Sequence, residues 1–168
     1  LSKRDFTRVT NPLKKFGMNI ISKNQGLPLI IRGLEKPRQI SYKEKKGSAQ
    51  CKSSVMLAAL KANGTTNIQA KKSRNHTELL FKSLKIPMRL KTTKNIDYIK
   101  VSSAKKIGPV NYKIPGDISS SSFLIVLTLL TKNSELLIKN VNINSSRVGI
   151  IHILKRMGAN IVFRNIKN

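Results

Sequence analysis

Two stretches of this sequence, about 70 residues apart, begin with similar residues and continue in the same way. GSAQCKSSVMLAAL at 47–60 and GDISSSSFLIVLTLL at 116–130 both change from small, hydroxylated residues to apolar ones. A turn and an alternating segment follow each of them, in KANGTTNIQ and in TKNSELLIK. Such an internal repeat predicts a chain built from one compact supersecondary unit that is used more than once.

The next part of the unit is repeated as well. KKSRNHTELLFKSLKI pairs with NSSRVGIIHILKRMGANI, which aligns Ser73 and Arg74 with Ser146 and Arg147. Apolar residues recur there at intervals of three and four, which predicts an amphipathic helix with one buried stripe. SKRDFTRVTNPLKKFGMNI, close to the start of the chain, is a third and partial copy.

Strands are expected between and after these helices. The alternating segments that follow both turns are candidates, together with 19–23, 27–33, 88–92, 98–102 and 160–164. Helices that alternate with strands at this spacing predict an α/β fold built from repeated units.

The composition is strongly basic, with 33 Lys and Arg against 7 Asp and Glu and a formal net charge of +26. That excess is typical of partners such as nucleic acids, so a basic nucleic-acid-binding module is one alternative. The cations are scattered, however, and aromatic residues make up only 5%. We interpret most of the charge as a solvated lysine surface that is compatible with an anionic small substrate.

The sequence contains one cysteine, Cys51, and no run of 18 apolar residues. A single cysteine cannot form an internal disulfide, and we expect it to pack on the buried side of a helix. With no membrane-spanning run and no secretory signal, the sequence predicts a reduced, cytoplasmic protein without membrane attachment.

We expect the stretches at 47–60 and 116–130 to form helices, and both begin with more hydroxyl and small residues than one N-cap requires. A helix start presents unpaired N–H groups and a partial positive charge, and small side chains allow a ligand to approach them. Nearby arginines could grip a carboxylate or phosphate with two hydrogen bonds. The pattern therefore favours a site for an anionic small molecule. The alternative is that these are ordinary helix-start residues.

Four stretches in order resemble the enolpyruvylshikimate-phosphate synthase family. They are LSKRDFTRVTNPLKKFGMNI, GSAQCKSSVMLAALKANGTT, SRNHTELL, and IPGDISSSS running through to MGANI. The resemblance implies two domains of repeated β-α-β-α-β-β units in an inside-out α/β barrel, with 1–113 forming most of one domain and 114–168 starting the second. It also implies a chain more than twice this length, so that the 168 residues would be an interior portion.

The resemblance implies transfer of the enolpyruvyl group of phosphoenolpyruvate to the 5-hydroxyl of shikimate 3-phosphate, with release of phosphate and without a cofactor or metal. The family enzyme would act as a monomer. The acid–base groups would lie outside these residues, so we expect no catalytic residue here and no turnover by the 168 residues alone. The implied substrate-binding residues are Arg4, Ser48, Ala49, Gln50, Ser73 and Arg74.

Each of these residues has an implied role. Arg4 would hold phosphoenolpyruvate, and Gln50 would touch both substrates. The pair formed by Ser48 and Ala49 would contact shikimate 3-phosphate. Arg74, with Ser73 beside it, would lie near the phosphate of that substrate.

Three positions depart from the family pattern. Asp5 replaces a proline and could compete for Arg4, Asn75 replaces an aspartate, and Lys85 stands where a glycine would end a helix. The sister enzyme that transfers enolpyruvyl to UDP-N-acetylglucosamine remains an alternative, as does a degenerate remnant that keeps the fold without the chemistry.

Overall fold

The computed structural model describes residues 4–104 and 106–166. The chain divides into two compact units, Leu1–Pro109 and Val110–Asn168. The predicted domain boundary after residue 113 stays a prediction.

The first unit opens with helix α1 (Thr7–Lys15), which is followed by an antiparallel hairpin of β1 (Asn19–Ser22) and β2 (Leu29–Arg32). Gly17 separates α1 from β1 and has a φ of +100°. Only glycine adopts that conformation without strain, so the residue ends the helix and turns the chain into the hairpin.

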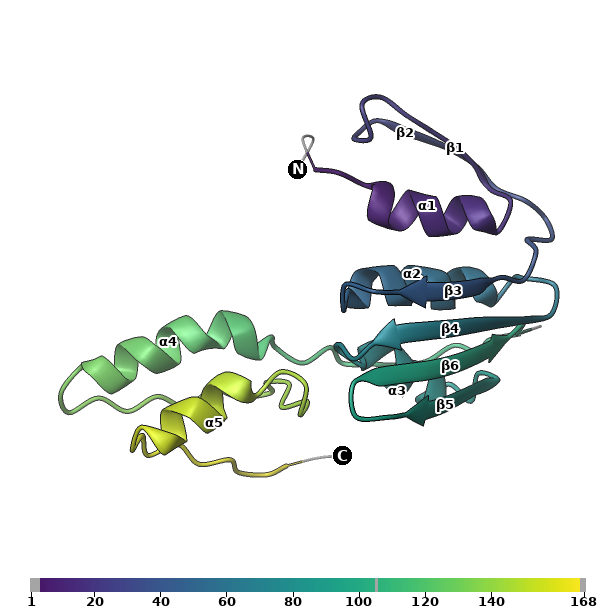
Figure 1. Ribbon diagram of the computed structural model, residues 1–168. Helices are drawn as coiled ribbons and strands as arrows, with labels where there is room; N and C mark the ends of the chain where they lie inside the picture. The colour runs from purple at the N-terminus through teal and green to yellow at the C-terminus, as the bar shows by residue number, and fades with distance from the viewer. Residues whose placement is uncertain (1–3, 105, 167–168) are drawn as a thin grey trace. The chain divides into compact units, whose positions relative to one another are not determined.

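A four-stranded sheet with two helices forms the remainder of this unit (Figure 1). Its elements follow the order β-α-β-α-β-β: β3 (Ser41–Glu44), α2 (Ala49–Ala59), β4 (Thr65–Lys71), α3 (His76–Ser83), β5 (Met88–Thr92) and β6 (Ile96–Ser102). The strand order in space is β3-β4-β6-β5. The pair β3 and β4 is parallel, whereas β6 runs antiparallel to both β4 and β5.

The main hydrophobic core lies between this sheet and its helices. Strands β4 and β6 bury every second residue, as expected for strands with one covered face. Ile68 and Ile99, which are paired in the sheet, meet Val55 and Met56 of α2 in the core, and Phe81 of α3 belongs to the same cluster.

The second unit contains helices α4 (Ile118–Leu130) and α5 (Gly149–Arg156). They run side by side in the same direction, and an extended segment follows each helix (Figure 1). A small core of Ile118, Val148 and Ile151 joins the two helices. None of the helices in residues 4–104 and 106–166 is long and apolar enough to cross a membrane.

The structure confirms the expected helices, the four strands of 19–33 and 88–102, and the strand after the first turn. It also confirms that Cys51 is buried and free. The strands expected after the second turn and at 160–164 are wrong, because those segments are extended but unpaired. A strand requires a hydrogen-bonded neighbour, and the described part of this unit provides only a bridge between Gly116 and Val141.

Candidate functional site

Two helices of the first unit begin at the same edge of the sheet. Strands β3 and β4 are parallel neighbours, so the turns that lead from them into α2 and α3 leave the sheet on the same side (Figure 1). A Cβ atom built on Gly47 would lie 3.7 Å from the carbonyl oxygen of Lys72, which shows how closely the turns approach. We call residues 47–50 and 72–74 the helix-start edge.

Glu44 shapes the first of these turns. Its buried carboxylate accepts the backbone N–H of Lys46 at 2.8 Å and that of Gly47 at 2.7 Å. Gly47 has a φ of +71°, which glycine adopts at little cost. The turn is therefore fixed before α2 begins. No sequence pattern singles out Glu44, because the two groups that it binds belong to the backbone.

Ser48, Ala49 and Gln50 form the start of α2. Ser48 is the N-cap, and its hydroxyl accepts the N–H of Cys51 at 3.3 Å. Ala49 is half-buried and Gln50 is exposed. The first N–H groups of a helix carry a partial positive charge, so an anion beside Gln50 would be favourably placed.

Ser73 and Arg74 lead into α3. The Ser73 hydroxyl oxygen is buried and makes no hydrogen bond among the described residues. Arg74 is exposed, and in the described part of the chain its guanidinium forms no ion pair. A planar guanidinium in solvent can bind a phosphate or carboxylate through two hydrogen bonds. Arg74 is therefore available to an anion at the helix-start edge.

Arg4 is exposed and precedes α1, whereas Leu1, Ser2 and Lys3 of the same motif lie outside the described residues. The neighbouring Asp5 accepts the backbone N–H of Thr7 at 2.7 Å. Hydrogen bonds from Thr7, aided by the charges of Arg8 and Lys46, lower the pKa of Asp5. The Asp5 carboxylate is thus engaged at the start of α1.

The surplus serines are used within the protein. Ser53 shares a hydrogen bond of 2.6 Å with Thr77, and Ser54 donates to the carbonyl of Cys51 at 2.8 Å. In α4, Ser121 and Ser122 donate to carbonyls one turn back in the same helix. Serine hydroxyls commonly bond in this way inside helices. The serine-rich sequence therefore offers fewer free hydroxyl groups than its composition indicates.

The start of α4 in the second unit has its own ion pair. Asp117 is the N-cap and accepts the N–H of Ser119 at 3.1 Å. Arg147 donates to Asp117 Oδ1 at 3.1 Å and also to the Ser119 hydroxyl. The Ser119 N–H, followed by Arg147, lowers the pKa of Asp117.

The structure reveals a buried charged cluster that the sequence did not indicate. Lys52 of α2 lies between Glu78 of α3 and Asp97 of β6, and none of the three residues is more than 5% exposed. Lys52 and Glu78 stand inside two of the motifs quoted above, yet their burial follows only from the fold.

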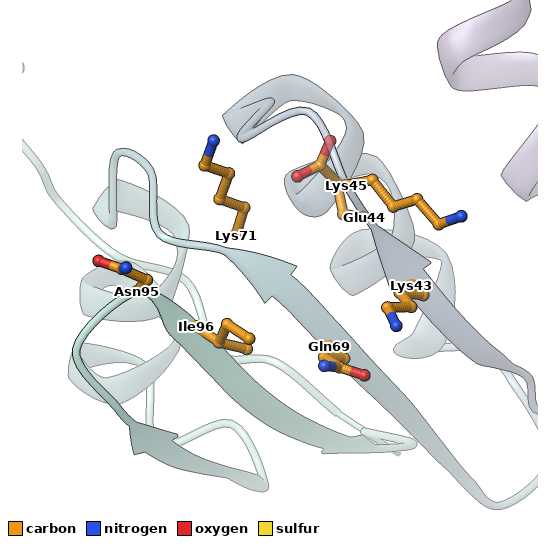
Figure 2. Close-up of a pocket in the computed structure, with 7 residues that line it drawn as sticks. All are labelled: Lys43, Glu44, Lys45, Gln69, Lys71, Asn95 and Ile96. Carbon is orange, nitrogen blue, oxygen red and sulfur yellow. The ribbon is translucent and has the colours of Figure 1, made fainter.

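A separate hollow of about 320 Å³ lies on the opposite face of the sheet (Figure 2). It is lined by Lys43, Glu44, Lys45, Gln69, Lys71, Asn95 and Ile96. Figure 2 shows the ammonium groups of Lys43, Lys45 and Lys71 pointing in different directions. Because these cations diverge, the helix-start edge is the better candidate for binding a small anion.

Comparison with known proteins gives matches over nearly the whole chain. A family model described as EPSP synthase (3-phosphoshikimate 1-carboxyvinyltransferase) matches residues 1–167. The 3-phosphoshikimate 1-carboxyvinyltransferase of Endomicrobium trichonymphae is 39% identical over 168 residues, which is 99% of this chain and 38% of that protein. The enzyme of the same name from Bacillus cereus strain G9842 is 37% identical over 169 residues, with the same coverage.

A solved structure agrees with the sequence matches. EPSP synthase from Acinetobacter baumannii aligns with a TM-score of 0.80 and 33% identity, covering 98% of this chain and 37% of that one. The chain thus spans less than two-fifths of the length of the relatives it matches. Its mixed α/β fold and a family match over nearly every residue lead to one conclusion: the chain belongs to the EPSP synthase family.

Proposed function

We propose that this chain forms part of an enzyme that transfers the enolpyruvyl group of phosphoenolpyruvate to the 5-hydroxyl of shikimate 3-phosphate and releases phosphate. One structural observation carries the proposal. The starts of α2 and α3 lie at the same edge of the sheet, with exposed Gln50 and Arg74 beside them. Both substrates are anions, which suits helix starts and arginines.

Each residue at the helix-start edge would make a different contact with the substrates. Arg74 would pair with the phosphate of shikimate 3-phosphate, while Ser48 and Ala49 would lie against the same substrate. Ser73 would share the contact with that phosphate, since its buried hydroxyl has no hydrogen-bond partner among the described residues. The Gln50 amide can donate and accept, so it would bridge the two substrates.

Arg4 would hold phosphoenolpyruvate from the segment before α1. Asp5 is engaged by Thr7, and this supports an Arg4 side chain that remains open to a substrate carboxylate or phosphate. Each charge-assisted hydrogen bond of this kind contributes about 1.5–3 kcal/mol. Proton transfer would come from groups outside the 168 residues.

The finer architecture is part of the same proposal. The elements β3 to β6 would be one complete β-α-β-α-β-β unit of an inside-out α/β barrel, and α4 with α5 would belong to another. Residues 1–113 would then contribute to one domain and 114–168 to a second. We propose a monomeric cytoplasmic enzyme whose lysine-rich surface does not serve nucleic-acid or membrane binding.

A chimera tests the activity. The 168 residues would replace the matched segment of the Bacillus cereus enzyme, and phosphate release would be measured with phosphoenolpyruvate and shikimate 3-phosphate. The proposal predicts turnover that is lost with shikimate or UDP-N-acetylglucosamine as the acceptor. A chimera that melts cooperatively like the parent enzyme but releases no phosphate would contradict the proposal.

A further inference from the structure

Lys52 is fully buried, with a side chain that is 0% exposed. Its ammonium nitrogen lies 2.5 Å from Glu78 Oε1 and 3.5 Å from Asp97 Oδ2. Lysine is seldom completely buried. The free energy lost when these charges are removed from water offsets much of their electrostatic attraction. Added stability is therefore a weak reason for keeping the cluster, which points to a role in fixing geometry.

The cluster joins the beginnings of two helices. Lys52 is in the first turn of α2, and Glu78 is in the first turn of α3. A second link stands directly beside this one, where the hydroxyl groups of Ser53 and Thr77 share a hydrogen bond of 2.6 Å. Both links tie the amino-terminal ends of α2 and α3 to one another.

Asp97 connects the charged cluster to the sheet. It is buried on the helix-covered face of β6 and is paired in register with Ala70, near the end of β4. Thr92 of β5 donates to Asp97 Oδ1 at 3.0 Å, which holds the carboxylate in place. The two helix starts are therefore fixed both to each other and to β6, which pairs with the strand that leads into α3.

We propose that Lys52 is a positioning residue, whose buried ammonium sets the separation between the start of α2, with Gln50, and the start of α3, with Arg74. Lys52 itself touches no substrate. The inference rests on the proposed function, because the spacing matters only if one anionic substrate contacts both helix starts. Lys52 would affect substrate binding only through the spacing of the two helix starts.

The variant has to remove the cluster without leaving a buried charge. Lys52→Met alone would leave two buried carboxylates without their cation and is expected to unfold the chain. The informative variant is Lys52→Met combined with Glu78→Leu and Asp97→Asn, which keeps an acceptor for Thr92. Lys61→Met is the matched control, since Lys61 is exposed just after α2.

The first measurement reports the helix spacing directly. Spin labels would be attached at Gln50→Cys and Arg74→Cys in a chain that also carries Cys51→Ala, and their dipolar coupling recorded by electron paramagnetic resonance. The proposal predicts one narrow distance in the parent and in Lys61→Met, and a broadened distribution in the triple variant. An unchanged distribution in the triple variant would overturn the proposal.

The second measurement is calorimetric titration of the unlabelled 168-residue chain with shikimate 3-phosphate. The triple variant should bind about tenfold more weakly than the parent, as expected from the loss of one well-placed charged hydrogen bond. Equal affinity in a folded triple variant would overturn the role of Lys52. If the parent does not bind the compound, the proposed function fails instead, and the distance measurement alone decides whether Lys52 sets the spacing.

Discussion

The buried carboxylate of Glu44 accepts the backbone N–H of Gly47 at 2.7 Å, across the turn that joins β3 to α2. This bond and its companion from Lys46 fix the approach to Ser48, the N-cap of α2. The geometry of the helix-start edge therefore depends on a carboxylate that accepts two backbone N–H groups.

Replacing Glu44 should destabilise the protein. Glu44→Gln removes the charge that two backbone N–H groups share, so the free energy of unfolding should fall by about 1–3 kcal/mol. Urea denaturation would measure this loss, with the exposed Glu35→Gln as the control, for which a change within about 0.5 kcal/mol is expected. Equal effects of both variants would show that the turn does not depend on the carboxylate.

Replacing Lys85 with glycine should stabilise the protein. It follows α3 with a φ of +53°, a conformation that costs an L-residue about 1–2 kcal/mol. Lys85→Gly should therefore raise the free energy of unfolding by about 1 kcal/mol, whereas Lys82→Gly inside α3 should lower it by about 1 kcal/mol. Thermal or urea unfolding of both variants would reveal the opposite signs. A loss of stability in Lys85→Gly would contradict this reading of the helix end.

The carboxyl of Asp117 should titrate below its ordinary pKa of 3.8, because Ser119 donates to it and Arg147 lies beside it. Because folding lowers this pKa, the ionised carboxylate stabilises the folded state at pH values above the ordinary pKa. That stabilisation is lost as the pH falls through the folded-state pKa. Carbon-13 NMR titration of Asp117 would measure the pKa.

Arg147→Met should move the pKa of Asp117 part of the way back, since the Ser119 N–H remains. Arg156→Met, at the exposed end of α5, provides the control. If both arginine variants leave the titration curve of Asp117 unchanged, the ion pair between Asp117 and Arg147 does not persist in solution.

Neighbouring residues of α2 should respond very differently to truncation. Met56 is 0% exposed in the core, whereas Leu57 is 54% exposed. Met56→Ala should cost about 2–5 kcal/mol of unfolding free energy, since it leaves a cavity. Leu57→Ala should cost far less, and similar losses in urea denaturation would mean that the sheet-facing side of α2 has been assigned incorrectly.

The repeated pattern of small and apolar residues was sufficient to predict α2, α4 and most strands. It missed β3, which has four residues and only one large apolar side chain, Tyr42, so its alternation is hard to see. Its other inward-facing residue is Glu44, which is buried although a charged residue in a strand is normally predicted to be exposed. A short strand with a buried acid is recognisable only beside its partner β4.

The candidate site was predictable only in part. Residues 48–50, 73 and 74 were identified from their resemblance to a family, and the parallel pairing of β3 with β4 then brought both segments to one edge. The cluster around Lys52 could not be predicted, because its three charged residues are far apart in the sequence. A lysine within an apolar helix gives no sign of burial until its partners are known.

An NMR titration of the nitrogen-15-labelled chain with shikimate 3-phosphate would show directly whether the two helix starts bind one anion. We expect chemical-shift changes concentrated at the amides of residues 48–50 and 73–74, and weaker changes with unphosphorylated shikimate. Changes confined to the hollow around Lys43 and Lys71, or no change at the helix starts, would contradict the proposal that these two segments form one anion-binding site.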